Sequence, residues 1–241
     1  MASEYFKNFA SVKYEMPNGV ILSVKDIFRK SVIEPAVANS IVDYAYYEIQ
    51  DGERPDVVAT RLYGDSNLYW LFYLVNDFDN FNSWYLSSLE FEKFLNDKYP
   101  GKYLTATAST NIVSSSSKFL LGERVTSASS SGNVIRVEPT YNRIAIEGGT
   151  WNANDVVTGA SSGKSFTVSS VQEHRDGVSY YKNSSGLKQN RTGSGFSPVT
   201  HFEHELEHNE ERRKIKIIRP QFVSVILKQF NEVMSAPGID G

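Results

Sequence analysis

The sequence predicts an α+β protein in which a small antiparallel β-barrel or sandwich is inserted between an N-terminal strand-helix-helix unit and a C-terminal strand and helix. Apolar residues at i, i+3, i+4 and i+7 indicate amphipathic helices near both ends of the chain. Between these helices, short β-branched runs alternate with Gly and Ser turns, which is typical of a small β module. We expect an N-terminal arm, a first domain, a Ser/Thr linker, an inserted β domain, a flexible loop and a C-terminal segment, at residues 1–40, 41–104, 105–117, 118–174, 175–200 and 201–241.

The first domain carries clear local signals for its secondary structure. Residues 42–49 are rich in β-branched and aromatic side chains and end at an Asp-Gly pair, which predicts a strand and a turn. Pro55 suits the first position of a helix and Gly64 suits its end. A second helix, capped by Asp65 or Ser66, follows. Its apolar stripe consists of Leu68, Leu71, Phe72 and Val75.

An excess of aromatic residues is the most informative feature of this domain. Between Tyr44 and Tyr85, twelve of 42 residues are Phe, Trp or Tyr, whereas residues 101–174 contain only five. A segment this short cannot cover so many rings by itself, and exposed apolar patches usually mark contact sites. We therefore expect a partner protein, with packing in the protein's own core as the alternative for each ring. The predicted partner-binding residues are Arg54, Tyr63, Tyr69, Trp70, Tyr73, Asp77, Trp84, Ile217, Phe222 and Phe230.

The arm, the linker and the inserted region have less regular patterns. Residues 1–40 spread apolar side chains between turns such as Pro17-Asn18-Gly19, so an arm that packs on another surface is expected. A short helix could begin at residues 23–26. Residues 105–117 contain mostly Thr, Ala and Ser, which is typical of a linker. Residues 176–198 are rich in Gly, Ser and Asn and predict a mobile loop. Strands of the inserted domain are predicted at residues 134–137, 143–146, 155–157 and 165–168.

The C-terminal segment combines a charged stretch with an apolar strand and helix. Residues 203–212 are densely charged and predict a solvated helix or a hairpin arm. Apolar and basic residues at 215–218 predict a strand. Pro220 can open a last helix that docks its apolar face on another surface. This face contains Phe222, Val223, Ile226, Leu227, Phe230, Val233 and Met234.

Composition excludes several classes of protein. The chain has 241 residues with 25 basic and 28 acidic side chains, so neither nucleic-acid binding nor strong attraction to a membrane surface is expected. Cysteine is absent, which excludes disulfides and thiolate chemistry and fits assembly in a reducing cytoplasm. We expect no signal peptide, because residues 1–10 contain charges and aromatics where an apolar run would be needed. We expect no membrane insertion, because no apolar run reaches 18 residues.

Residues 204–208, with the sequence His-Glu-Leu-Glu-His, match the H-E-x-x-H motif of zinc metalloproteases. On a helix, His204 and His208 lie one turn apart and could bind zinc, with Glu205 as the general base. Glu232 could supply a third ligand, but a predicted strand separates it from the motif. The zinc helix of such enzymes is buried, whereas charged residues surround these histidines. An accidental match in a solvated helix is the favoured interpretation, and no metal or other cofactor is expected.

The other candidate sites are weaker. Residues 159–165 end like a phosphate-binding loop, but the first Gly stands too close to Lys164 and the run lies among β segments. A turn between two strands is therefore predicted. The glycines at 193 and 195 are expected to lie in a loop, and His174 on the surface.

Several motifs resemble a known family. The order of strand, Gly turn, helix, Tyr-Gly, helix and Asn resembles a LysM module, which is a small βααβ unit. Three stretches look like the LysM-containing baseplate wedge subunit of contractile-tailed, T-even-like phages, namely Asp26-Ile27-Phe28-Arg29, the block from Arg54-Pro55 through Tyr63-Gly64 and Leu68-Tyr69-Trp70 to Asn76-Asp77, and the stretch from Arg213 to Ile218. The resemblance covers about residues 20–100 and 200–235 and is absent between about 105 and 198.

The resemblance implies a structural virion protein without enzymatic activity that joins wedges around the tail tube during baseplate assembly. It implies six copies per baseplate, with other baseplate wedge proteins and the inner baseplate or tail-tube region as partners. The protein would be made in the host cytoplasm and located in the tail baseplate of the virion. A peptidoglycan-binding LysM protein is the first alternative, because a fold does not fix a function. The zinc metalloprotease is the second.

Overall fold

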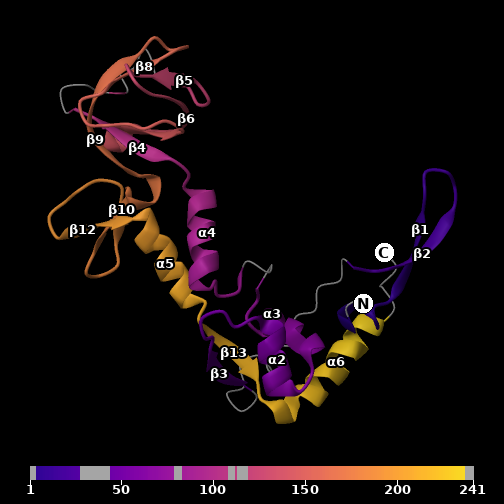
Figure 1. The fold of residues 1–241 in the computed structure, drawn as a ribbon. Helices are drawn as coiled ribbons and strands as arrows, with labels where there is room; N and C mark the ends of the chain where they lie inside the picture. The colour runs from indigo at the N-terminus through magenta and orange to yellow at the C-terminus, as the bar shows by residue number, and fades with distance from the viewer. Residues whose placement is uncertain (1–3, 28–43, 79–82, 108–111, 113–118, 237–241) are drawn as a thin grey trace. The chain divides into compact units, whose positions relative to one another are not determined.

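Figure 1 shows a computed structural model of the chain, which describes residues 4–27, 44–78, 83–107, 112 and 119–236. The chain divides into two compact units, of which unit 1 consists of Met1–Ser88 and Asn209–Gly241 and unit 2 of Leu89–His208. Unit 2 is therefore inserted into unit 1. Both units contain helices and strands, which confirms the predicted α+β class. None of the described helices has the length and apolar character needed to cross a membrane.

A strand-helix-helix-strand arrangement forms the centre of unit 1. Its elements are β3 (Tyr44–Glu48), α2 (Pro55–Tyr63), η2 (Ser66–Tyr69), α3 (Trp70–Val75) and β13 (Lys214–Ile218). Strands β3 and β13 pair antiparallel, with Tyr47 opposite Ile215 and Ala45 opposite Ile217. The strand that completes this sheet thus follows the inserted unit in the sequence, as the colours in Figure 1 show.

Local signals set the limits of α2 as predicted. Pro55 is the first helical residue, and Gly64 ends the helix in the left-handed conformation with φ of 76°. The N–H of Gly64 donates to the carbonyl of Thr60 at 3.0 Å. Asp65 caps the following turn by accepting from the backbone N–H of Asn67 at 2.9 Å. The predicted second helix is divided into the 3-10 turn η2 and the short helix α3.

The side chain of Asn76 fastens the end of α3 to β13. Its amide nitrogen donates to the carbonyls of Lys216 at 2.9 Å and Phe72 at 2.8 Å. Its amide oxygen accepts from the N–H of Lys216 at 2.8 Å. One side chain therefore satisfies both backbone groups of Lys216, as a neighbouring strand would do.

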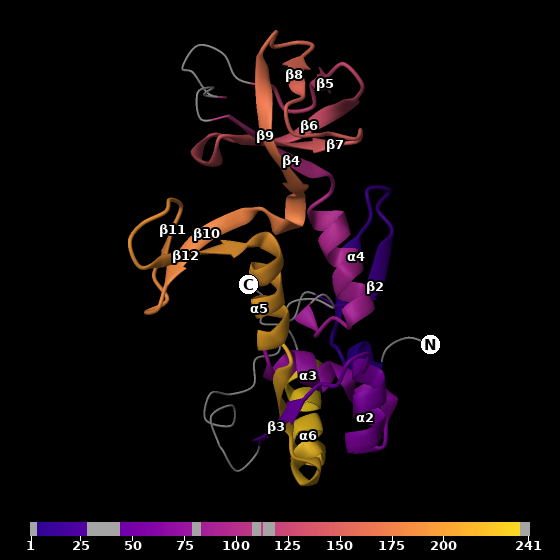
Figure 2. The same ribbon diagram turned by 60° about the vertical axis from the view of Figure 1, so that its left-hand side comes forward.

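The chain's two terminal segments complete unit 1. The turn η6 (Pro220–Phe222) leads into α6 (Val223–Ser235), which lies against α3 in both views (Figures 1 and 2). The N-terminal segment contains η1 (Glu4–Phe6) and a hairpin of β1 (Ser11–Glu15) and β2 (Ile21–Lys25). Val233, which was predicted to lie on the apolar face of α6, is 56% exposed instead. The buried face of α6 consists of Val223, Ile226, Phe230 and Met234.

Unit 2 contains a closed antiparallel β-barrel in the order β4-β7-β6-β5-β8-β9 (Figure 2). Of the two predicted architectures, barrel and sandwich, the structure shows the barrel, because the sheet closes on itself. Leu104, Ile144 and Val157 are fully buried in its interior. The turn η4 (Pro139–Tyr141) joins its longest hairpin. The barrel strands are β4 (Lys102–Ala106), β5 (Arg124–Thr126), β6 (Ser131–Glu138), β7 (Arg143–Glu147), β8 (Val156–Gly159) and β9 (Ser165–Glu173).

The rest of unit 2 differs from expectation at two places. Thr105 and Ala106, which were expected in a linker, lie in strand β4 of the barrel. The loop expected at residues 175–200 instead contains a three-stranded sheet in the order β11-β10-β12. Its turn is fixed by Asn183, whose amide oxygen accepts from the N–H of Leu187 at 2.8 Å. The elements around the barrel are α4 (Ser88–Lys98), η5 (His174–Asp176), β10 (Val178–Asn183), β11 (Lys188–Gln189), β12 (Phe196–Thr200) and α5 (His201–Glu211).

The turn between β8 and β9 contains the run that ends like a phosphate-binding loop. As predicted, it joins two strands, and its amides bind a carboxylate of the protein itself. Buried Glu123 accepts from the N–H groups of Ser162 at 2.9 Å, Ser161 at 3.2 Å and Leu120 at 2.7 Å. Burial favours a higher pKa for Glu123, but these amide bonds outweigh burial and hold the pKa below its ordinary value.

We expect Glu123→Ala to lower the free energy of unfolding of the barrel by about 3 kcal/mol, because three backbone donors lose their acceptor. Urea unfolding followed by the fluorescence of buried Trp151 measures this effect. Glu147→Ala, at an exposed position of β7, is the control and should cost less than about 0.5 kcal/mol. Equal stability of the two variants would contradict the assigned role of Glu123.

Candidate protein-interaction site

The predicted aromatic cluster lies in two hydrophobic cores of unit 1. In the first core, the ring of Trp70 lies between the N-terminal segment and α6. Its centroid is 4.4 Å from that of Phe230 and 5.1 Å from that of Tyr5. Phe9 is also buried in this core. These contacts leave Trp70 only 8% exposed.

The second core is formed by the β3-β13 sheet, α2, α3 and the segment that contains Trp84. The ring centroid of Trp84 lies 5.7 Å from that of Phe72 and 6.2 Å from that of Tyr73. Its indole nitrogen donates to the carbonyl of Glu53 at 2.8 Å. Trp84 therefore has both an apolar environment and a hydrogen-bond acceptor within unit 1.

The expectation that a partner protein covers these rings is therefore wrong for the buried ones, such as Trp70, Phe72 and Trp84. The covering groups belong to the same chain, but they come from residues 5–9 and 215–234, which lie far from the aromatic segment in the sequence. The helix α3 contributes to both cores, which explains why it is apolar on nearly all sides. Core packing thus accounts for most of the aromatic excess.

The ten predicted partner-binding residues differ widely in exposure. Trp70, Trp84, Ile217 and Phe230 are buried, whereas Tyr63, Tyr69, Tyr73 and Phe222 are half-buried and Arg54 and Asp77 are exposed. Arg54 forms an ion pair with Asp56 at 3.2 Å. Tyr69 and Tyr73 pack edge to face, with ring centroids 6.3 Å apart. Their contact with a partner stays a prediction, and the exposed members are the ones that a partner can reach.

The His-Glu-Leu-Glu-His motif lies on α5, where Glu205 forms hydrogen bonds to other side chains of the protein. Glu205 is buried and accepts from the Tyr99 hydroxyl at 2.6 Å and from the Lys98 ammonium at 2.9 Å. Burial favours a higher pKa for Glu205, but these two partners outweigh burial and lower the pKa. His204 and His208 stack edge to face, with ring centroids 4.5 Å apart.

Glu232, the third ligand considered for this motif, belongs to α6 in unit 1, where its carboxylate lies 4.0 Å from the Lys228 ammonium. Within the part of the chain that the structure describes, no group of three or more His, Cys, Asp or Glu side chains could hold a metal ion. The helix that carries the motif packs in unit 2 partly through buried polar side chains such as Glu205.

His174 and His201 form a buried pair in unit 2, with ring centroids 5.7 Å apart. His174, which was expected on the surface, has its Nδ1 3.0 Å from the carbonyl of Pro100. His201 has its Nε2 3.2 Å from the Tyr103 hydroxyl. The guanidinium of Arg143 stands 3.7 Å from the centre of the Tyr103 ring. Burial lowers the pKa of both histidines, and that of His201 falls to about 4.

The β1-β2 hairpin is the largest group of exposed apolar side chains in unit 1, as far as the described residues show. The sequence analysis predicted an arm in this region but no strands, and the short helix predicted from residues 23–26 is wrong, because residues 21–25 form strand β2. The signal was available, because apolar and polar residues alternate from Val12 to Glu15 and an Asn18-Gly19 pair follows, which is a strong hairpin signature. Gly19 indeed adopts φ of 76° in the turn.

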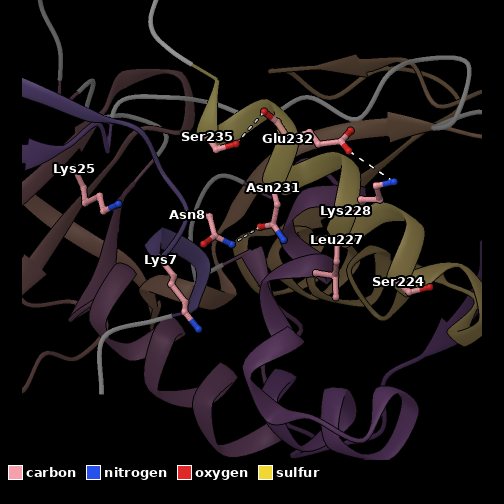
Figure 3. A pocket seen from close by; sticks show the side chains of 9 residues that line it. All are labelled: Lys7, Asn8, Lys25, Ser224, Leu227, Lys228, Asn231, Glu232 and Ser235. Atoms are coloured by element: carbon pink, nitrogen blue, oxygen red, sulfur yellow. Dashed lines mark hydrogen bonds and ion pairs between the residues drawn. The ribbon is translucent and has the colours of Figure 1, made fainter.

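A shallow groove lies at the root of the hairpin, between the N-terminal segment and α6 (Figure 3). Its volume is about 820 Å³. Asn8 crosses the groove and donates to the side chain of Asn231 at 2.9 Å. Three of the lining residues are lysines, namely Lys7, Lys25 and Lys228, and Glu232 is the one acidic residue among them.

Comparison with known proteins finds one similar family for the segment that supplies most of unit 1. This segment is similar to phage baseplate proteins, since residues 5–99 match the model of the family described as base plate wedge protein 53. The matched residues include the hairpin, α2, α3 and α4, and they exclude all strands of the barrel, β13 and α6. No curated protein matches the chain.

Phe230→Ala should lower the free energy of unfolding of unit 1 by about 3–5 kcal/mol, because it removes a ring from the first core. Val233→Ala, on the exposed side of the same helix, is the control and should cost less than about 0.5 kcal/mol. Denaturant titration followed by Trp70 fluorescence distinguishes the two. A cost below 1 kcal/mol for Phe230→Ala would contradict its assignment to the core.

Unit 2 should lose stability as the pH falls below about 6.5. The unfolded chain then binds protons at His174 and His201, whereas the folded state, with depressed histidine pKa values, does not. Arg143 opposes protonation of the pair, and Glu138, which accepts from Arg143 at 2.7 Å, favours it. For His201 alone the loss amounts to about 3 kcal/mol when the pH reaches 4.

Hydrogen exchange of β4 amides, corrected for intrinsic rates, measures this loss of stability. The range from pH 6.5 to 5 is chosen because most carboxylates titrate below it. His201→Phe keeps the aromatic contacts but removes one proton-binding group, so its stability should fall less steeply with pH. Identical pH profiles for the wild type and the variant would contradict the assigned role of His201.

Proposed function

We propose that the protein is a structural subunit of a phage baseplate wedge. The single observation that carries this proposal is the match of residues 5–99 to the baseplate wedge family. The same residues build most of unit 1, together with the C-terminal strand and helix. The structural bonds of Glu205 support a role without catalysis, because a general base needs a carboxylate that is free to take a proton.

The finer assignment is that the subunit joins wedges around the tail tube during baseplate assembly in a contractile-tailed phage. Its partners would be other baseplate wedge proteins and the inner baseplate or tail-tube region, with six copies in each baseplate. The protein would be made in the host cytoplasm and end in the tail of the virion. Support comes from the motif residues at 26–29, 54–77 and 213–218 and from the exposed apolar hairpin.

We further propose that the centre of unit 1 is a LysM-like module. Two helices lie between strands that pair antiparallel, which is the order of a βααβ unit. In this interpretation unit 2 is an insertion between the second helix and the second strand. The first core argues against sugar binding, because α6 and the N-terminal segment cover rings that a sugar would otherwise reach.

A phage whose gene for this protein carries a nonsense mutation tests the proposal. We expect free wedge proteins to accumulate and assembled baseplates to be absent by electron microscopy, since one joining component is missing. The intact chain supplied from a plasmid should restore baseplates, and mass spectrometry should then detect it in purified tails. Normal baseplates in the mutant, or binding of the purified chain to cell-wall peptidoglycan without any tail association, would refute the assignment.

A further inference from the structure

We infer that the β1-β2 hairpin is an assembly arm that docks its apolar face on a different subunit of the baseplate, one that presents an apolar strip bordered by acidic side chains. The inference rests on the proposed function and deepens it, since it assigns the contact surface and the chemistry of the partner. It also concerns residues outside the aromatic segment.

The hairpin has one apolar face and one largely polar face. In the antiparallel register Val12 lies opposite Val24 and Tyr14 opposite Leu22. Because side chains of a strand alternate between its faces, these four residues share one face. Their exposed fractions range from 37 to 56%, so the described part of the chain leaves this face uncovered. The other face carries Ser11, Lys13, Glu15, Ser23 and Lys25, with Ile21 as the apolar exception.

A free amphipathic hairpin of this kind is unfavourable for an isolated protein. Two strands alone are marginally stable in water, and among the described residues β1 and β2 pair only with each other. An exposed patch of this composition usually marks a contact site. The face is therefore explained best by a surface that covers it in the assembled particle.

The root of the hairpin is fixed to unit 1, so the arm is held in position. The N–H of Asp26 donates to the carbonyl of Ala10 at 2.9 Å, and the N–H of Ala10 donates to the carbonyl of Met234 at 2.9 Å. The Lys25 ammonium donates to the carbonyl of Phe9 at 2.7 Å, and Phe9 is buried in the first core. A hairpin held in this way can dock at a smaller entropic cost than a loose terminus.

The charges at the root indicate the chemistry of the partner. Lys25 is the last residue of β2 and also lines the groove, together with Lys7 and Lys228 (Figure 3). Among the residues that line the groove, these three lysines stand against one acidic residue, Glu232. The surface next to the arm is thus basic, and acidic side chains of a partner would complement it.

Two observations favour a different subunit over a second copy of this chain. The strand spacing and rise give one face of such a hairpin roughly 200 Å², whereas a stable interface needs about 800 Å² per partner. A symmetric dimer through this surface would also bring two sets of groove lysines into one interface. A different subunit with an acidic border avoids this repulsion and can contact the basic groove as well as the hairpin, which enlarges the interface. The arm lies within the residues similar to baseplate wedge proteins.

Leu22→Asp tests the inference, because it places a charge on the apolar face of the arm. Ser23→Asp places the same charge on the next residue, on the polar face, and is the matched control. Each full-length variant is supplied to the phage with the nonsense mutation, and its amount in purified tails is measured by mass spectrometry. We expect Leu22→Asp to reduce incorporation at least tenfold and Ser23→Asp less than twofold, with both melting within 2 °C of wild type. Equal incorporation would overturn the inference.

A photo-crosslinking residue at position 22 identifies the occupant without relying on a disruptive variant. A crosslink to a different baseplate protein, absent when the same residue stands at position 23, supports the inference. A crosslink to a second copy of this chain, or none at either position, overturns it. Absence of the wild-type chain from tails refutes the proposed function instead, so the two failures can be distinguished.

Lys228→Glu tests the charge of the partner. The exposed Lys228 is 4.0 Å from Glu232, so its replacement should leave the melting temperature unchanged. We expect incorporation to fall at least threefold and to depend on salt concentration during assembly in vitro. Lys93→Glu, at an exposed position of α4, is the control. An increase in incorporation with Lys228→Glu would overturn the acidic assignment.

Discussion

The antiparallel pairing of β3 with β13 is the constraint on which the structure of unit 1 depends. It joins two segments that lie on opposite sides of the inserted unit in the sequence. The pairing places Ile215 and Ile217 in the second core and Ile218 in the first. It also sets the start of α6, whose Phe230 covers Trp70. Asn76 reinforces the sheet by binding both backbone groups of Lys216. Loss of this pairing would expose both cores together.

The sequence predicted the features that depend on neighbouring residues. Pro55 and Gly64 mark the ends of α2 because their backbone preferences act locally. The turn at residues 159–165 and the β-type inserted domain followed from short patterns of the same kind. Contacts between distant segments were harder to predict. No local pattern shows that Tyr5 and Phe230 cover Trp70, or that Tyr99 and Lys98 bind Glu205.

The helix α5 shows how a catalytic motif can arise from packing requirements. His201, Glu205 and Asn209 follow one another at intervals of four residues and form a buried polar stripe. Each of them has a hydrogen-bond partner, since buried polar groups are costly without one. The sequence analysis interpreted this charged stretch as solvated, because composition alone does not reveal which polar side chains face the interior. The motif is thus explained by a helix that packs through hydrogen bonds as well as apolar contacts.

Asn209 also holds together the two points at which the chain passes between unit 1 and unit 2. Its side chain accepts from the N–H of Leu86 at 2.9 Å and donates to the carbonyl of Leu86 at 3.0 Å. The point where the polypeptide leaves unit 1 is thereby tied to the point where it returns. Because these two points lie close together, unit 2 can be replaced by a short connecting loop without separating the two parts of unit 1. The same frame of unit 1 can therefore carry inserted domains of different size.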